Sequence, residues 1–310
     1  MRLPSIKEFN ERIISCFTER SDVLVRENTL LSYQLAGAEK SYDIFQFSSA
    51  KIIPTDPIVL IRAGIHGDEI FGPLTLMKYS GEIFSYAHER GVKLIIFPLD
   101  NPSGFEGKTR YNVVGDIGEG GNNDYLRYRI SDGRIVGDLG TSDEFVSWFW
   151  ASDPGFNIHL PAETLISHQA LQKLPLNQVR ALIDLHADNY IIIPGTYYYS
   201  FANGRQYETI LNRIERVVPI LRNEYIDSGF LNIAGYTAEE IQAGHIVKDQ
   251  FNPKTDQFGS ITRHDGTLPD LFHRLGALHC LTIEITGATD PAAADIVNLA
   301  WIHGLIDLVA

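Results

Sequence analysis

Cysteine is scarce in this 310-residue chain, and its two cysteines, Cys16 and Cys280, cannot supply a disulfide framework for the fold. Positive charge is also in short supply, because 26 basic residues stand against 39 acidic ones and leave a net charge of -13. This balance argues against nucleic acid or an anionic membrane as a partner. No run approaches the roughly 18 apolar residues of a membrane span. The first residues also lack an apolar signal core, so we expect a cytoplasmic protein.

Several common catalytic motifs are absent as well. The chain has no His-Glu-x-x-His and no Gly-x-Ser-x-Gly, so neither thermolysin-like nor serine-hydrolase chemistry is indicated. Gly107-Lys108-Thr109 ends like a phosphate-binding loop, but Pro102 stands where the first glycine of that loop belongs. Gly118-Glu119-Gly120 is followed by Asn123 in place of the third glycine of a dinucleotide loop. The sequence therefore predicts no nucleotide site.

The apolar pattern predicts the fold class. An apolar content of 44% and a charged content of 21% are typical of globular proteins. Helices are expected at 5–20, 71–87, 162–173 and 291–310, an antiparallel pair within 22–49, and further strands at 58–64, 93–99, 181–186, 190–193 and 279–285. This alternation predicts one α/β domain over residues 1–310, with a mixed, mainly parallel sheet and helices on both faces. Residues 115–121 and 249–270 are expected to form long loops over one sheet edge.

The stretch His66-Gly67-Asp68-Glu69 is the first candidate for chemistry. It follows the apolar run 58–61, so it should lie at the carboxyl end of a buried strand, where α/β sheets place their ligands. An imidazole and a carboxylate three positions apart can bind one divalent ion, and both are ligands that zinc accepts. A catalytic zinc needs a third protein ligand and leaves one position for water.

Two later strands supply the missing groups. His186 ends the apolar run 181–185 and is the candidate for the third ligand. Glu284 lies inside the apolar strand 281–285, where a carboxylate is costly unless it is paired, bound to metal or catalytic. The carboxyl ends of parallel strands converge at one edge, so these side chains should come within reach of His66 and Glu69.

The order of these motifs resembles the zinc metallocarboxypeptidase family, with the related aspartoacylase and succinylglutamate desuccinylase group, over roughly residues 40 to 300. His66-x-x-Glu69 is followed by Asn101-Pro102-Ser103-Gly104, by Asp184-Leu185-His186 and by Thr282-Ile283-Glu284. Asp270 and Gly276 precede Thr282 and Glu284 in the order and spacing of the family. Pro161-Ala162-Glu163-Thr164 resembles the family's Glu-Thr helix start.

The resemblance implies a site and a mechanism. His66, Glu69 and His186 would bind one zinc ion per chain, and Glu284 would activate the zinc-bound water as a general base. Arg110 resembles the arginine that stabilises the developing oxyanion in both groups. The alternative for Arg110 is a surface arginine in a loop.

The substrate-binding half departs from the carboxypeptidase pattern. The adjacent Asn-Arg pair that holds a terminal carboxylate is missing, and Asn123 with Arg127 is the candidate replacement. The family's mobile tyrosine has no counterpart, and Arg263 or His264 could bind substrate in that region. Asp270 is expected at the rim of the active site, with a loop cap as its alternative.

The sequence thus predicts a zinc-dependent hydrolase of an amide or peptide bond, acting on a peptide or peptide-like substrate. The alternative is an N-acyl amino acid deacylase of the aspartoacylase or succinylglutamate desuccinylase type. A third hypothesis, a catalytically inactive binding protein that keeps the fold, is disfavoured by the complete set of ligands and base. The substrate and the oligomeric state stay open.

Overall fold

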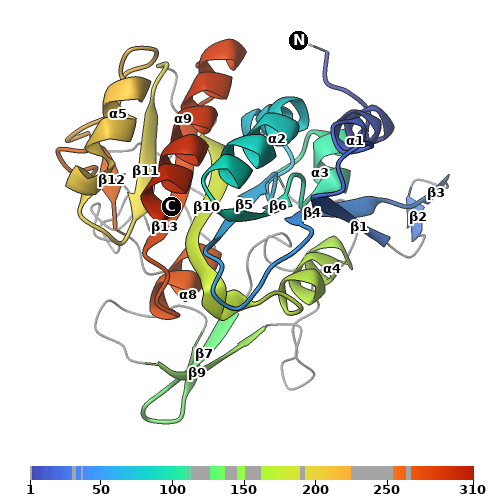
Figure 1. Cartoon of the computed structure of the whole chain (residues 1–310), viewed down its shortest axis with the longest axis horizontal. Helices are drawn as coiled ribbons and strands as arrows, with labels where there is room; N and C mark the ends of the chain where they lie inside the picture. Colours follow the sequence, from blue (N-terminus) through green and yellow to red (C-terminus); the bar gives the residue numbers. More distant parts are fainter. Residues whose placement is uncertain are drawn as a thin grey trace, which may run out of the picture.

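A central mixed sheet organises the molecule (Figure 1). The computed structural model describes residues 2–29, 33–35, 38–110, 112, 126–136, 145–150, 162–188, 193–224, 254–262 and 267–310. Within these residues, eight strands form the sheet in the order β1-β4-β6-β5-β10-β13-β11-β12. Their bounds are Val23–Thr29 (β1), Asp43–Ser49 (β4), Ile58–Ala63 (β5), Lys93–Phe97 (β6), Val179–Asp188 (β10), Thr196–Ser200 (β11), Ser260–Ile261 (β12) and His279–Thr286 (β13).

The middle of the sheet is parallel. Strands β6, β5, β10 and β13 run side by side in the same direction, whereas β1, β4 and β11 join antiparallel to their inner neighbours. Two small sheets lie apart from it. They are built from β2 (Tyr33–Leu35) with β3 (Ala38–Lys40), and from β7 (Leu126–Ile130) with β8 (Ile135–Val136) and β9 (Phe145–Trp150).

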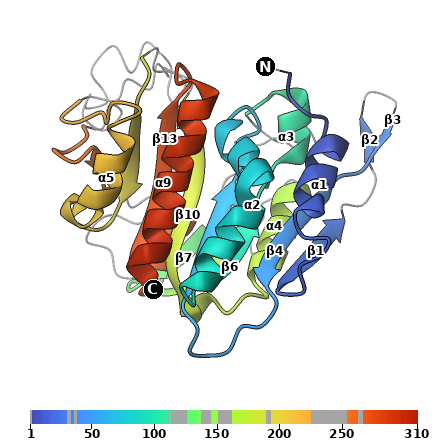
Figure 2. The same ribbon diagram turned by 45° about the horizontal axis from the view of Figure 1, so that its top comes forward.

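Helices cover both faces of the sheet. The helical elements are α1 (Ile6–Ser15), α2 (Phe71–Glu89), α3 (Pro102–Gly107), α4 (Ala162–Leu171), η1 (Leu176–Gln178), η2 (Gly204–Tyr207), α5 (Glu208–Ile214), α8 (Leu268–Arg274) and α9 (Pro291–Val309). Helices α1, α2 and α9 lie side by side on one face (Figure 2). Alternate residues of β5 explain the two layers, since Val59 and Ile61 pack under these helices while Leu60 packs with α4 and α8. The expected single α/β domain with a mixed, mostly parallel sheet is therefore confirmed.

Helix α9 is the one described helix that is long and apolar enough to cross a membrane by length and composition. Its residues Val297, Trp301 and Leu305 are almost completely buried, and the helix packs on α2, β5 and β10. This packing in the core accounts for its apolar composition.

Most expected elements are present, and several differences from the expected pattern stand out. The antiparallel pair is β1 with β4, and part of the segment between them forms the separate β2–β3 hairpin. Strand β11 was not predicted, although its sequence Thr-Tyr-Tyr-Tyr-Ser is rich in residues that favour strands. The expected loop 249–270 is wrong in part, because it contains β12 and the start of α8, where Pro269 occupies the first turn. The expected strand 190–193 and loop 115–121 fall largely outside the described residues.

One close backbone approach sets the shape of the sheet edge. The turn after β5 passes directly over α3, and a Cβ atom on Gly67 would lie only 2.1 Å from the carbonyl carbon of Gly104. The backbone N–H of Gly67 also donates to the carbonyl of Arg110 at 3.1 Å. Only glycine fits at position 67 without moving one of these backbones.

We expect Gly67→Ala to lower the free energy of unfolding by about 1–3 kcal/mol or more, as overpacking against a fixed backbone does. Chemical denaturation measures this change. Gly81→Ala is the matched control, because a Cβ atom there meets its nearest neighbour, the Cβ of Cys16, at 3.5 Å in the middle of α2. That control should be neutral or stabilising by up to about 1 kcal/mol. Equal stability of the two variants would contradict the close approach.

Candidate metal centre

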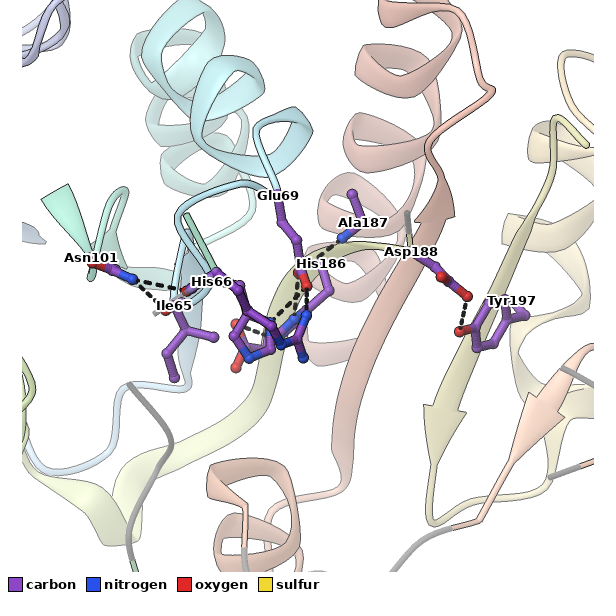
Figure 3. Close-up of polar contacts among 10 residues, drawn as sticks. Ile65, His66, Glu69, Asn101, His186, Ala187, Asp188 and Tyr197 are labelled. Atoms are coloured by element: carbon purple, nitrogen blue, oxygen red, sulfur yellow. Dashed lines mark hydrogen bonds and ion pairs between the residues drawn. The ribbon is translucent and has the colours of Figure 1, made fainter. Parts of the chain in front are cut away.

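Three buried side chains meet at the carboxyl ends of β5 and β10. Ligand atoms of His66, Glu69 and His186 all lie within 4.8 Å of one another. The Nδ1 atom of His66 is 2.7 Å from Oε1 of Glu69, and the Nδ1 atom of His186 is 2.8 Å from Oε2 (Figure 3). The two imidazole rings are edge to face, with centroids 5.0 Å apart. Two imidazoles and one carboxylate form a donor set that zinc accepts.

The Glu69 carboxylate is the hub of this cluster. Besides the two histidines, it accepts a hydrogen bond from the backbone N–H of Ala187 at 3.1 Å and from Nη1 of Arg110 at 2.8 Å. Burial alone would raise the pKa of Glu69, but the two histidines hold it well below its usual value. Glu69 is therefore a carboxylate, the form in which it binds a cation.

A second carboxylate stands behind His186. Oδ1 of Asp184 lies 3.4 Å from Nε2 of His186, on the side of the ring away from Glu69. Residues 184 and 186 share one face of β10 because side chains alternate along a strand. Asp184 is opposite Arg62 of β5, whose guanidinium pairs with Asp100 at 2.5 Å. Metal-binding histidines commonly have such a carboxylate on the second ring nitrogen, where it fixes the ring orientation.

The surroundings act oppositely on the two histidines. Burial lowers the pKa of His66, which favours the neutral imidazole that a metal needs. Burial also disfavours charge on His186, but the carboxylates of Asp184 and Glu69 outweigh it and raise the pKa of His186 well above its usual value. The negative charges that attract a proton to His186 would equally attract a metal cation.

Glu284 lies beside this cluster on the neighbouring strand. It is directly opposite His186 in the parallel β10–β13 register. Burial raises the pKa of Glu284 to about 8. The negative charges of Glu69 and Asp188 also raise this pKa, whereas the positive charges of His186 and Arg110 lower it. A carboxyl group with a pKa near neutrality can accept and return a proton in one cycle.

A buried polar network holds Arg110 and the His66 turn together. The side-chain amide of Asn101 donates to the carbonyls of Arg110 at 3.1 Å and Ile65 at 3.3 Å, as Figure 3 shows for Ile65. Its oxygen accepts from the backbone N–H of Gly104 at 2.8 Å, so Asn101 also caps α3. The Asn-Pro-x-Gly motif thus joins the two loops that carry His66 and Arg110.

Glu163 anchors this network from α4. Its carboxylate accepts hydrogen bonds from the backbone N–H of Ser103 at 2.8 Å, from its hydroxyl at 2.6 Å and from Asn112 at 2.9 Å. Asn112 also donates to the Asn101 oxygen at 2.9 Å. Burial raises the pKa of Glu163, although these hydrogen bonds lower it in part. The Glu-Thr helix start of the sequence therefore supports the metal turn from the side.

Sequence reasoning assigned no role to a carboxylate–tyrosine pair next to the cluster. Asp188 accepts a hydrogen bond from the Tyr197 hydroxyl at 2.8 Å (Figure 3), and Tyr197 is opposite Glu284 in the β11–β13 register. Asp184, Asp188 and His186 share one face of β10, and this alternation was the available signal. Tyr197 could not be found, because β11 itself was not predicted.

The structure describes only one of the predicted substrate-binding side chains, that of Asp270. Asn123, Arg263 and His264 lie outside the described residues, as does the side chain of Arg127 in β7. Asp270 is fully buried in the first turn of α8 and accepts from Nε of Arg274 at 3.0 Å. This pairing within a helix differs from the loop cap that was the alternative, and a contact of Asp270 with substrate stays a prediction.

Comparison with known proteins gives two findings. Residues 55–119, which contain His66, Glu69, Asn101 and Arg110, match the family model of the succinylglutamate desuccinylase/aspartoacylase catalytic domain. A search of curated protein sequences gives no match.

Solved structures extend the likeness to the whole chain. A presumed metallopeptidase from Shewanella baltica is 20% identical with a TM-score of 0.62, over 98% of this chain and 92% of its own. A metallo-carboxypeptidase from Burkholderia cenocepacia is 12% identical with a TM-score of 0.57, over 98% of this chain and 69% of its own. Thrombin-activatable fibrinolysis inhibitor is 13% identical with a TM-score of 0.59, over 98% and 74%.

At these identities the structures show a shared fold. That fold is the zinc carboxypeptidase-like one, and the family match covers the turn that carries His66 and Glu69. The whole chain thus shares its fold with metallocarboxypeptidases, and residues 55–119 are similar to the succinylglutamate desuccinylase/aspartoacylase catalytic domain.

Proposed function

We propose that the chain is a zinc-dependent hydrolase that cleaves an amide bond in a peptide or peptide-like substrate. The observation that carries this proposal is the convergence of His66, Glu69 and His186, with ligand atoms within 4.8 Å of one another. Glu284 stands opposite His186 on the next strand. Three protein ligands of this kind are typical of a catalytic rather than a structural zinc site. The Glu284 carboxylate is not needed as a fourth ligand.

The chemistry divides between the metal and the chain. A bound zinc ion supplies a Lewis acid that polarises the scissile carbonyl and lowers the pKa of water. Glu284 accepts the proton of the attacking water on its carboxylate and passes it to the leaving nitrogen. Because a cation next to Glu284 favours its charged form, metal binding shifts its pKa down from about 8, toward a base that is ionised at neutral pH.

Arg110 is proposed to stabilise the negative charge that develops on the carbonyl oxygen. Its guanidinium donates to Glu69 at 2.8 Å, which holds it at the cluster, and 33% of the side chain is exposed. A cation that is fixed before the reaction needs little reorganisation when charge develops.

The second candidate is an N-acyl amino acid deacylase. The match of residues 55–119 to the desuccinylase/aspartoacylase model favours it, and so does the missing Asn-Arg pair. Both candidates use the same metal, base and arginine. They differ in whether the substrate is recognised as a peptide with a free carboxyl terminus or as an acyl group on one amino acid.

Glu284→Gln should retain zinc and lose turnover by about 10² to 10⁴-fold, because the amide cannot accept the proton. Metal analysis and hydrolysis assays on the same preparation measure both properties. Glu89→Gln, a change at the exposed end of α2, is the control and should be unaffected. Full activity of Glu284→Gln would refute its role as the base.

Asp184→Asn should weaken zinc binding by about 10- to 100-fold, because His186 loses the carboxylate that orients it. Competition titration of the zinc-free protein with a chelator gives the dissociation constant. Asp188→Asn is the matched control: it removes the same charge from the same face of β10, but Asp188 bonds to Tyr197. Equal weakening in both variants would mean that only the net charge matters.

A substrate panel separates the two candidates. Peptides with a free carboxyl terminus, the same peptides amidated at that end, and N-acetyl and N-succinyl amino acids should be compared by kcat/KM with the zinc-loaded protein. The proposal expects the free peptides to be preferred. Preference for the N-acyl amino acids would establish the deacylase instead.

A further inference from the structure

A cavity of about 350 Å³ lies at the opposite end of the sheet from the metal centre. Its walls come from β1, β4 and the segment after β4 on one side, and from the segment between α4 and β10 on the other. Ser48 near the end of β4 is opposite Ile95 in the middle of β6, and Gln178 directly precedes β10, whereas the metal ligands lie at the carboxyl ends of β5 and β10. The cavity is therefore separate from the proposed active site.

Two glutamine side chains line this cavity. Gln46 is only 2% exposed. On the facing wall, Oε1 of Gln178 is buried without a hydrogen-bond partner among the described residues. A buried amide oxygen without a partner costs free energy, so a polar molecule in the cavity that donates to Gln178 would relieve this cost.

The charge of the lining is opposite to that of the protein. The chain has a net charge of -13, yet the described residues that line the cavity include the cations Arg26 and Lys173 and no Asp or Glu. Arg26 lies directly across from Gln46 in the β1–β4 register, so a cation and an amide share this wall. Arginine binds carboxylates through two parallel hydrogen bonds.

The remaining walls restrict the ligand further. Ile52, Ile95 and Leu174 are apolar and suit a short carbon chain. The Gln178 oxygen needs a hydrogen-bond donor. Because the described lining of the cavity has no acidic side chain, a neutral N–H or O–H suits this position better than an ammonium group, which would find no counter-charge there.

We propose that this cavity binds a small organic carboxylate that also carries a neutral N–H or O–H donor, such as an N-acylated amino acid or a hydroxy acid. Arg26 and Lys173 bind the carboxylate, while Gln46 and Gln178 bind the polar atoms of the rest. The site does not depend on the metal or on the proposed reaction.

Titration calorimetry with N-acetyl-L-leucine as the probe tests the proposal. Zinc-free protein is used so that the metal centre does not contribute. The full chain should bind this probe, and its methyl ester and free L-leucine should bind at least tenfold more weakly. Inorganic phosphate is included because it fits the cations but not the apolar wall. No binding of the probe, or tighter binding of phosphate, would overturn the proposal.

Two variants locate the binding. Arg26→Gln, at an exposed position on the edge strand β1, should weaken the probe by about 10-fold or more, as expected for a lost charged hydrogen bond. Arg180→Gln is the matched control, since this exposed arginine of β10 does not line the cavity. Hydrolysis at the metal centre should be unchanged in both variants. Equal binding by Arg26→Gln and the unmodified chain would exclude this cavity as the site.

Discussion

The buried Glu69 carboxylate is the interaction on which the candidate site depends. It faces both imidazoles, the backbone N–H of Ala187 and the guanidinium of Arg110 within 3.1 Å. Such a carboxylate would be costly in the interior without these partners. Because its partners come from β10 and from the Arg110 loop, one side chain holds together segments that are distant in the sequence.

The surrounding structure is arranged to keep that carboxylate in place. Gly67 lets the metal turn lie directly on Gly104 of α3, and Asn101 bonds to the loops on both sides. Glu163 then connects α3 to α4 through Ser103. A displacement of any of these elements would reach Glu69 through hydrogen bonds and backbone contact, which is why the motifs around the ligands carry so many polar residues.

The sheet separates two kinds of polar chemistry. At the carboxyl ends of its parallel strands, acidic groups surround His66 and His186 and favour a cation. At the other end, Arg26 and Lys173 line a cavity whose described lining has no acidic side chain, and they favour an anion. An overall charge of -13 indicates neither arrangement, because local charge is decided by which side chains the strands bring to one end.

Much of the metal half of the site could be predicted from the sequence. The apolar runs before His66 and His186 predicted where two strands end. Because the carboxyl ends of parallel strands converge at one edge of a sheet, these ligands could be expected to lie close together. Glu284 was conspicuous because a charge interrupts an apolar strand. The resemblance to the metallocarboxypeptidases added Arg110, which the structure brings to 2.8 Å from Glu69. A role for Asp184 was not predicted, although its position two residues before His186 on one strand was the available signal. A role for Tyr197 was not predicted because its contact with Asp188 joins two strands.

The sequence by itself determined the periodicities, and with them the α/β class, the main strands and the ligand types at their ends. Only the tertiary structure decided that Tyr197 reaches Asp188 and that Gln46 and Gln178 face one cavity. The physical reason is that apolar periodicity is a local property. Register, close backbone approach and the pairing of buried polar groups depend instead on residues that meet only after the chain has packed.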